Sequence, residues 1–200
     1  FGVDGGWKGL RARPEFVNKF ADPTGASDNR AMFQMDGQTL SIASVADEKE
    51  GYGVRKWTNK KSNGDNGSSP SGAFVDTDFP MFRLADAYLM YAELAARGTG
   101  SVATAVNYVN VLRTRANAST IAAGDLTLDF ILAERSRELY WECHRRQDLI
   151  RFGKFSGGSY LWQWKGNSAN GAPISDNLKV FPIPDRAKSA NPTLVQNIGY

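Results

Sequence analysis

Apolar residues recur at three- and four-residue spacing from residue 82 onward, which predicts helices. In the stretch 82–97 two such series lie side by side, and charged residues occupy only a narrow stripe. We therefore expect a helix that is buried on more than one side. Pro80 precedes this helix, and Gly98 is well suited to end it because glycine readily adopts a left-handed conformation.

A second helix is predicted over 102–116, with Ser101 as its N-terminal cap. The short link between the two predicted helices favours an antiparallel hairpin of the tetratricopeptide kind. The unit is not repeated in this sequence. One hairpin cannot bury both of its faces, so we expect partner helices that lie outside this chain.

A third helix is predicted over 128–143, where Thr127 can cap the first turn. The apolar side of this helix includes Leu139 and ends at Cys143, which we expect to be a small core residue. A shorter helical piece should follow up to Phe152. The rest of the chain is expected to be extended, with a short helical turn after Pro184.

The first 78 residues are rich in Gly, Asn, Asp and Ser, which is typical of irregular structure. Within them we predict a short helix at 14–20 and strands near 31–35 and 52–57. The sequence thus predicts a mainly α fold with little sheet. Its expected organisation is a loop-rich region, 1–78, followed by a helical region with an extended tail, 79–200.

Composition, net charge and cysteine content exclude several classes of protein. The 200 residues are 42% hydrophobic and 22% charged, as in ordinary globular chains. The net charge of +3 comes without a concentrated basic run, which disfavours nucleic-acid binding. The single cysteine excludes an internal disulfide and a multi-cysteine metal site. No apolar run approaches the roughly 20 residues of a membrane-spanning helix.

Charged residues are densest between residues 134 and 151. Glutamates spaced four apart there repel one another unless cations lie opposite them. We expect arginines of the second helix to supply these cations and to form a structural ion network. Its predicted members are Arg113, Arg115, Glu134, Glu138, Glu142, Arg145 and Asp148.

Three alternatives give the same segment a chemical role. Two of its carboxylates resemble a glycosidase acid/base pair, but both would lie on one helix among arginines. Glu142 and His144 are spaced for different sides of a helix, which disfavours a metal site. Cys143 and His144 are neighbours that diverge on a helix, which disfavours a nucleophile–base pair. The sequence therefore predicts no catalytic residue, no metal and no cofactor.

Aromatic residues are the remaining candidates for ligand contacts. Tyr160, Trp162 and Trp164 alternate, so in an extended segment they would share one side and could stack against sugar rings. Alternatively, they cover the end of the helical core. Trp7 lies in a glycine-flanked loop that runs to Arg11, and this loop is a second candidate for ligand contacts.

Several segments together resemble the SusD/RagB family. They are similar to its "RLAEAYLMYAEA" helix, its "N-x-(I/V)-R-x-R-A" helix, its "ERxRELxxEGxRxxDLIRW" segment and its closing "FPIP…NPNLxQNPGY". The corresponding residues are 82–93, 110–116, 134–152, and 180–184 with 191–200. Cys143 and Phe152 stand where the family more often has Gly and Trp. The stretches 7–11 and 15–20 also resemble the family's middle region.

This resemblance implies a SusD-like helical fold with tetratricopeptide-like pairs and an irregular loop-rich region. It implies an exported lipoprotein on the outer face of a Bacteroidetes-type outer membrane, anchored through a lipid that lies upstream of this chain. Such proteins bind oligosaccharides or polysaccharides and deliver them to a SusC-like TonB-dependent transporter, without hydrolysing them. Family members are more than twice as long, so we expect this chain to be their C-terminal portion.

The resemblance leaves the ligand open. Ligand-binding residues vary among family members, so none is transferred to this chain. A family member that delivers peptides, a hydrolase, and a lid without a ligand of its own are the alternatives.

Overall fold

A computed structural model describes residues 9–68 and 74–200. The chain forms two compact units, residues 1–145 and 146–200. The expected boundary near residue 78 falls inside the first unit. It separates a loop-rich stretch from a helical one and stays a prediction about domain organisation.

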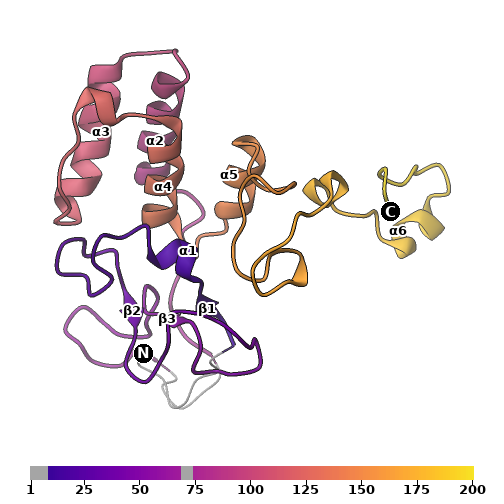
Figure 1. The fold of residues 1–200 in the computed structure, drawn as a ribbon, viewed down its shortest axis with the longest axis horizontal. Coiled ribbons are helices and arrows are strands. Elements are labelled where there is room, and N and C mark those ends of the chain that lie inside the picture. The colour runs from indigo at the N-terminus through magenta and orange to yellow at the C-terminus, as the bar shows by residue number, and fades with distance from the viewer. Residues whose placement is uncertain (1–8, 69–73) are drawn as a thin grey trace. The chain divides into compact units, whose positions relative to one another are not determined.

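Three helices pack together in the first unit (Figure 1). They are α2, Leu84–Ala96, α3, Val102–Arg115, and α4, Leu128–Leu139. Helix α2 contacts both of the others, so its buried face is the centre of the core. That core contains Leu89, Ala92, Ala105, Val109 and Ile131, each fully buried. The predicted helical periodicity is confirmed for these elements.

Both predicted N-terminal caps are present. The Ser101 hydroxyl accepts a hydrogen bond from the Thr104 backbone amide at 3.3 Å, and the Thr127 hydroxyl accepts one from Phe130 at 3.1 Å. Each satisfies an amide that the first helical turn leaves unpaired. A short 3₁₀ helix, Ala123–Asp125, precedes α4.

The expected end of the third helix is wrong. Helix α4 ends at Leu139, and the chain then turns through two left-handed residues, Trp141 with φ 59° and Cys143 with φ 64°. Residues in this conformation cannot continue a right-handed helix. Cys143 is consequently exposed and is not the core residue that the periodicity predicted.

The loop-rich part of the first unit holds a small antiparallel sheet of strand order β1-β3-β2. Its elements are β1, Arg11–Ala12, β2, Phe33–Gln34, and β3, Tyr52–Val54, accompanied by the helix α1, Pro14–Val17. Phe33 pairs with Val54 across the sheet. The predicted helix and strands are present but shorter than expected, and the fold of the described residues is mainly α.

An aromatic cluster joins this sheet to the end of α4. The rings of Phe16 and Tyr140 lie 4.9 Å apart, and Phe20 and Phe33 pack edge-on at 5.6 Å. The Tyr140 hydroxyl donates to the Arg30 carbonyl at 2.6 Å, so this buried phenol has a partner. The cluster fixes the loop around Arg30 over the carboxyl end of α4.

The second unit contains short helical elements connected by turns. These are α5, Arg145–Arg151, which begins at the boundary between the units, the 3₁₀ helices Lys165–Asn167 and Asp176–Lys179, and α6, Asp185–Ala190. The Arg146 guanidinium lies against the rings of Phe155 and Phe181, 5.0 and 4.3 Å from their centroids. It also donates to the Leu178 carbonyl at 2.7 Å, which fixes the tail to α5.

The outer side of α2 is exposed in this chain. Leu84 is 65% exposed and Leu94 52%. The helix packs against both α3 and α4, so the expected burial on more than one side is present. The exposed remainder agrees with the expectation that these two helices cover only part of it. Beside these residues, Tyr88 stacks on Tyr108 of α3 with ring centroids 4.4 Å apart.

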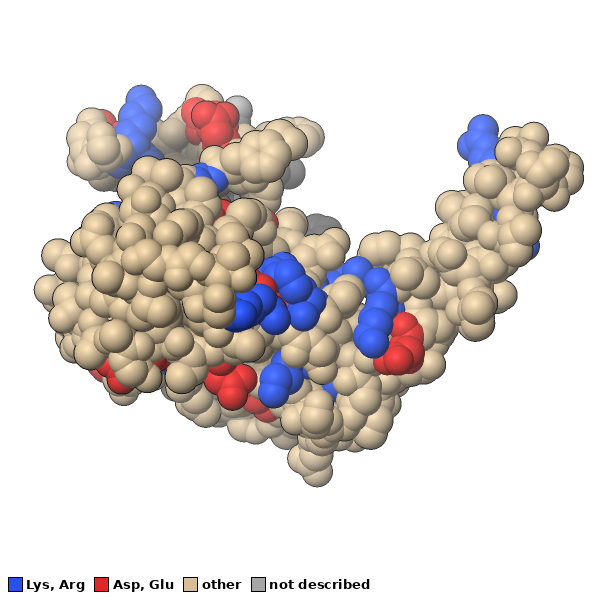
Figure 2. All heavy atoms as spheres, turned by 90° about the horizontal axis from the view of Figure 1, so that it is seen from above, with Lys and Arg blue, Asp and Glu red and all other residues tan. Residues whose placement is uncertain are grey.

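Basic side chains occur in small groups rather than as one continuous basic surface on the face that Figure 2 shows. This agrees with the absence of a basic run in the sequence. In the described part of the chain, none of the helices has the length and apolar character needed to cross a membrane.

Candidate functional site

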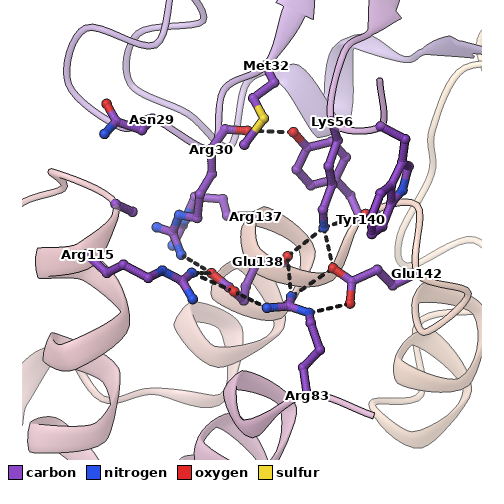
Figure 3. A pocket seen from close by; sticks show the side chains of 12 residues that line it. Asn29, Arg30, Met32, Lys56, Arg83, Arg115, Arg137, Glu138, Tyr140 and Glu142 are labelled. Carbon is purple, nitrogen blue, oxygen red and sulfur yellow. Dashed lines mark hydrogen bonds and ion pairs between the residues drawn. The ribbon is translucent and has the colours of Figure 1, made fainter. Parts of the chain in front are cut away.

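A pocket of about 370 Å³ lies in the first unit, between the loop-rich part and the adjoining ends of α2, α3 and α4 (Figure 3). Residues from five separate stretches of the sequence meet there. The lining consists of Asn29, Arg30, Met32, Lys56, Trp57, Arg83, Arg115, Ala116, Arg137, Glu138, Tyr140 and Glu142.

Glu138, near the end of α4, is the most heavily shared carboxylate of the pocket. Arg115 donates to both of its oxygens at 2.7 Å, and Arg83 and Arg30 donate at 3.0 and 3.3 Å. The side chain is 2% exposed. The predicted pair between Glu138 and an arginine of the second helix is thus present, together with two further cations.

Glu142 lies in the turn after α4. Arg83 binds it through Nε and Nη2 at 2.7 and 2.8 Å, and the Lys56 ammonium contacts its Oε1. Lys56 also donates to the carbonyls of Glu138 and Tyr140, both at 2.9 Å. Its three donors therefore hold the irregular chain after Leu139 in place.

Glu134 completes the network inside α4. Its side chain is fully buried and accepts from Arg30, Arg113 and Arg137 at 2.6–2.9 Å. Arg30 in turn pairs with Asp28 at 2.8 Å. All four carboxylates are joined through shared cations into one network.

The cations keep the glutamates ionised. Burial by itself raises the pKa of Glu138, but the hydrogen bonds and charge of Arg115 and Arg83 outweigh it and hold the pKa below its usual value. The pKa of Glu134 is lowered for the same reason by Arg30, Arg137 and Arg113, again against the effect of burial. In Glu142, Arg83 and Lys56 overcome burial and lower the pKa.

The network has members beyond those expected from the sequence. Of the other expected members, Arg145 donates to the Leu132 carbonyl at 2.8 Å, and Asp148 pairs with Arg151 at 2.7 Å within the second unit. Five members were not named from the sequence: Asp28, Arg30, Lys56, Arg83 and Arg137. Three of them come from the loop-rich part, where no periodic pattern indicates a partner for α4.

The aromatic candidates lie in the second unit. The rings of Tyr160 and Trp162 are 6.1 Å apart and inclined by 59°, and both side chains are half-buried. Trp164 has a left-handed backbone with φ 65°. The alternation expected of an extended segment therefore breaks at Trp164, because the chain turns there.

Lys165 organises this aromatic loop. Its side chain is buried, and the ammonium donates to the carbonyls of Gly157 and Tyr160 at 2.9 and 2.7 Å. It also lies 4.5 Å from the centroid of the Trp162 ring. Burial lowers the pKa of this lysine. A single cation thus fixes both the backbone of the loop and one of its aromatic rings.

The remaining candidates are Trp7 and Arg11. Trp7 lies outside the described residues. The Arg11 guanidinium donates to the carbonyls of Val45, Asp47 and Glu50, with 2.8 Å to Val45 and 2.7 Å to Glu50. Its donors hold the loop 45–50, and its role in ligand binding stays a prediction.

Within residues 9–68 and 74–200, no three His, Cys, Asp or Glu side chains are grouped so as to hold a metal ion. Glu134, Glu138 and Glu142 all form ion pairs with arginines, and Glu142 also with a lysine. The geometry is that of a structural network around a pocket, accompanied by a separate aromatic loop.

The comparisons with known proteins point to one family. Residues 19–200 match the SusD family. The chain is 39% identical over 163 residues to the starch-binding protein SusD of Bacteroides thetaiotaomicron, a match covering 82% of this chain and 28% of that protein. It is 36% identical over 130 residues to SusD-like protein P25 of Formosa agariphila, covering 60% of this chain and 24% of that protein.

Solved structures agree. A surface glycan-binding protein A from Bacteroides thetaiotaomicron superposes with a TM-score of 0.65 at 26% identity, over 100% of this chain and 43% of that one. The chain thus spans less than half the length of these relatives. The match over nearly its whole sequence, with the same helical fold, places it without ambiguity: the chain belongs to the SusD family.

Proposed function

We propose that this protein binds oligosaccharides or polysaccharides at the outer face of a bacterial outer membrane and passes them, uncleaved, to a SusC-like TonB-dependent transporter. The observation that carries the proposal is the 39% identity to a protein named for starch binding. Because the chain spans 28% of that protein, the activity belongs to the whole protein of which this fold is a part.

The aromatic loop supports glycan binding. Sugar rings stack on aromatic faces through their C–H bonds, since the π face is negative. Tyr160 and Trp162 provide two inclined, partly accessible rings on a loop fixed by Lys165. A rigid aromatic pair loses little conformational entropy on binding.

The state of the glutamates supports binding without hydrolysis. A glycosidase needs a carboxylic acid whose pKa is raised so that it can protonate the leaving oxygen. The pKa values of Glu134, Glu138 and Glu142 are all lowered, and each carboxylate is occupied by cations. None of the three is suited to donate a proton.

A combined glycan and peptide array tests the proposal, with Trp162→Ala as the informative variant. Trp141→Ala is the matched control, because Trp141 is 42% exposed and lies outside the aromatic loop. We expect glycan binding by the parent and the control, and weakened binding by Trp162→Ala. Binding of peptides alone would replace the proposal by the peptide-delivery alternative, and new reducing ends after incubation would indicate a hydrolase.

The location and the transporter are tested in cells with the full-length protein. We expect it to be accessible to a non-permeant label at the cell surface and to co-purify with a TonB-dependent transporter. An unlabelled protein in intact cells would contradict the proposed location.

A further inference from the structure

The ion network around the pocket carries more cations than carboxylates. Its ion pairs join six cations to four carboxylates, which leaves a formal excess of two positive charges at neutral pH. The members are Asp28, Glu134, Glu138, Glu142, Arg30, Lys56, Arg83, Arg113, Arg115 and Arg137. None of them forms an ion pair with any other residue in the described part of the chain.

This excess cannot be neutralised from within the network. Each of the three glutamates already serves two or three cations, and their side chains are 0–2% exposed. Most of the cations are also shielded, with Arg30 only 6% and Arg137 only 11% exposed. Unbalanced charge in a partly buried site is unfavourable unless a counter-charge approaches it.

The pocket offers a place for such a counter-charge, since five of the six cations line it. Arg115 is 53% exposed and uses only Nη2 to bind Glu138. Its Nε and Nη1 make no hydrogen bond to any described residue. In Figure 3 Arg115 lies at the end of the network, so these two donors remain for a ligand.

Asn29 provides a neutral donor and acceptor at the same pocket. Its backbone amide donates to the Ala116 carbonyl at 2.8 Å, which fixes it beside the end of α3. Its exposed side-chain amide has no hydrogen-bond partner among the described residues, and no dashed line reaches it in Figure 3. Trp57 forms another part of the wall, where its Nε1 donates to the Trp141 carbonyl at 3.2 Å.

We propose that this pocket binds the carboxylate or sulfate group of an acidic oligosaccharide, with Arg115 as the principal donor. The planar guanidinium fork matches the oxygens of both groups. The volume of about 370 Å³ lies in the range of roughly 300–1,000 Å³ that is usual for small-ligand pockets. The inference rests on the proposed glycan-binding function and adds the charge of the ligand to it.

Two variants address the pocket and one serves as a control. Arg115→Gln removes the principal donor while Glu138 keeps Arg30 and Arg83. Asn29→Asp places a negative charge at the pocket without removing any ion pair. Asn107→Asp makes the same charge change at an exposed position of α3 that does not line the pocket.

The experiment is titration calorimetry in low salt with four probes: sodium sulfate, a trigalacturonate, a sulfated trisaccharide and neutral maltotriose. Sulfate and at least one acidic trisaccharide should bind, the trisaccharide more tightly than maltotriose. We expect Arg115→Gln to weaken this binding about tenfold or more, as for the loss of a charge-assisted hydrogen bond. Asn29→Asp should weaken it about three- to tenfold, as for a like charge about 6 Å away near a surface.

The control Asn107→Asp should bind all probes like the parent. Equal sulfate binding by the parent and both pocket variants, or none at all, would overturn the proposal. Sulfate binding without a preference for either acidic trisaccharide would also overturn it, because the pocket would then take a free anion only. If one of these contradicting results is obtained but maltotriose still binds, the proposed glycan-binding function is retained and only the acidic-ligand proposal is rejected. If Arg115→Gln lowers the melting temperature, the effect of Asn29→Asp on sulfate binding tests the proposal instead, because that variant removes no ion pair.

Discussion

Arg83 and Glu142 form an ion pair with two parallel hydrogen bonds, Nε to Oε2 at 2.7 Å and Nη2 to Oε1 at 2.8 Å. Arg83 immediately precedes α2, and Glu142 lies in the turn that follows α4. The pair therefore joins the start of one helix to the chain beyond the end of another. Arg83 also reaches Glu138, so one guanidinium fixes two carboxylates at the pocket.

Glu138→Ala should destabilise the fold by about 3–5 kcal/mol, because it leaves the cations that share this carboxylate without their counter-charge. Urea unfolding measures the change. Glu48→Ala, at an exposed position, is the control and should stay within about 0.5 kcal/mol of the parent. A Glu138→Ala protein that keeps its stability and loses ligand binding would show a binding role instead.

Acid should unfold this protein through the same carboxylates. Their pKa values are lower in the folded state, so their contribution to stability is fully present above the ordinary glutamate pKa of 4.5. That contribution is lost as the pH falls through the lowered values. We expect the urea midpoint to be flat from pH 7 to about 5 and to fall steeply below about 4.5. Glu138→Gln should make the fall shallower, and an unchanged slope would contradict this assignment.

Cys143→Gly should stabilise the protein. A left-handed residue that carries a Cβ costs about 1–2 kcal/mol, and glycine removes this cost while adding freedom to the unfolded chain. The expected net gain is about 0.5–1 kcal/mol in the free energy of unfolding. Cys143→Ser keeps the Cβ and should show no gain. A loss of stability in the glycine variant would mean that the thiol has a packing role.

Lys165→Met should loosen the aromatic loop of the second unit. The substitution leaves the Gly157 and Tyr160 carbonyls without their donor. Because Gly157 is exposed and Tyr160 half-buried, each loss costs less than the about 1–3 kcal/mol of a fully buried acceptor. We expect faster proteolysis between residues 157 and 175 and a shifted tryptophan emission. Lys188→Met in α6 is the control. Unchanged proteolysis would argue that the loop is held by other contacts.

The exposed side of α2 should associate with apolar partners. Leu84 and Leu94 are both more than half exposed. Their ten-residue spacing places them roughly 80° apart around the helix, within one broad exposed side. The double variant Leu84→Ser with Leu94→Ser should bind less of a hydrophobic dye and sediment with less self-association than the parent. Equal dye binding would place the apolar surface elsewhere.

The sequence determined the local parts of this fold. Helical periodicity predicted α2 and α3 to within two residues at each end, and the caps Ser101 and Thr127 are where hydroxyls next to apolar runs indicated. It also indicated that the glutamates of α4 need arginines nearby, with those of α3 as candidates, because like charges spaced along one helix require cations opposite them. Each of these inferences uses residues close together in the sequence or on facing helices.

The tertiary structure decided the rest. Arg30 meets Glu134 across 104 residues and Lys56 meets Glu142 across 86, and no local pattern in the loop-rich part specifies those contacts. The turn after Leu139 likewise depends on Lys56, which binds the carbonyls there and holds Cys143 outside the helix. Periodicity indicates which face of a helix is apolar. Only long-range packing determines which cations reach the carboxylates of α4, and therefore where the ion network keeps an excess of positive charge.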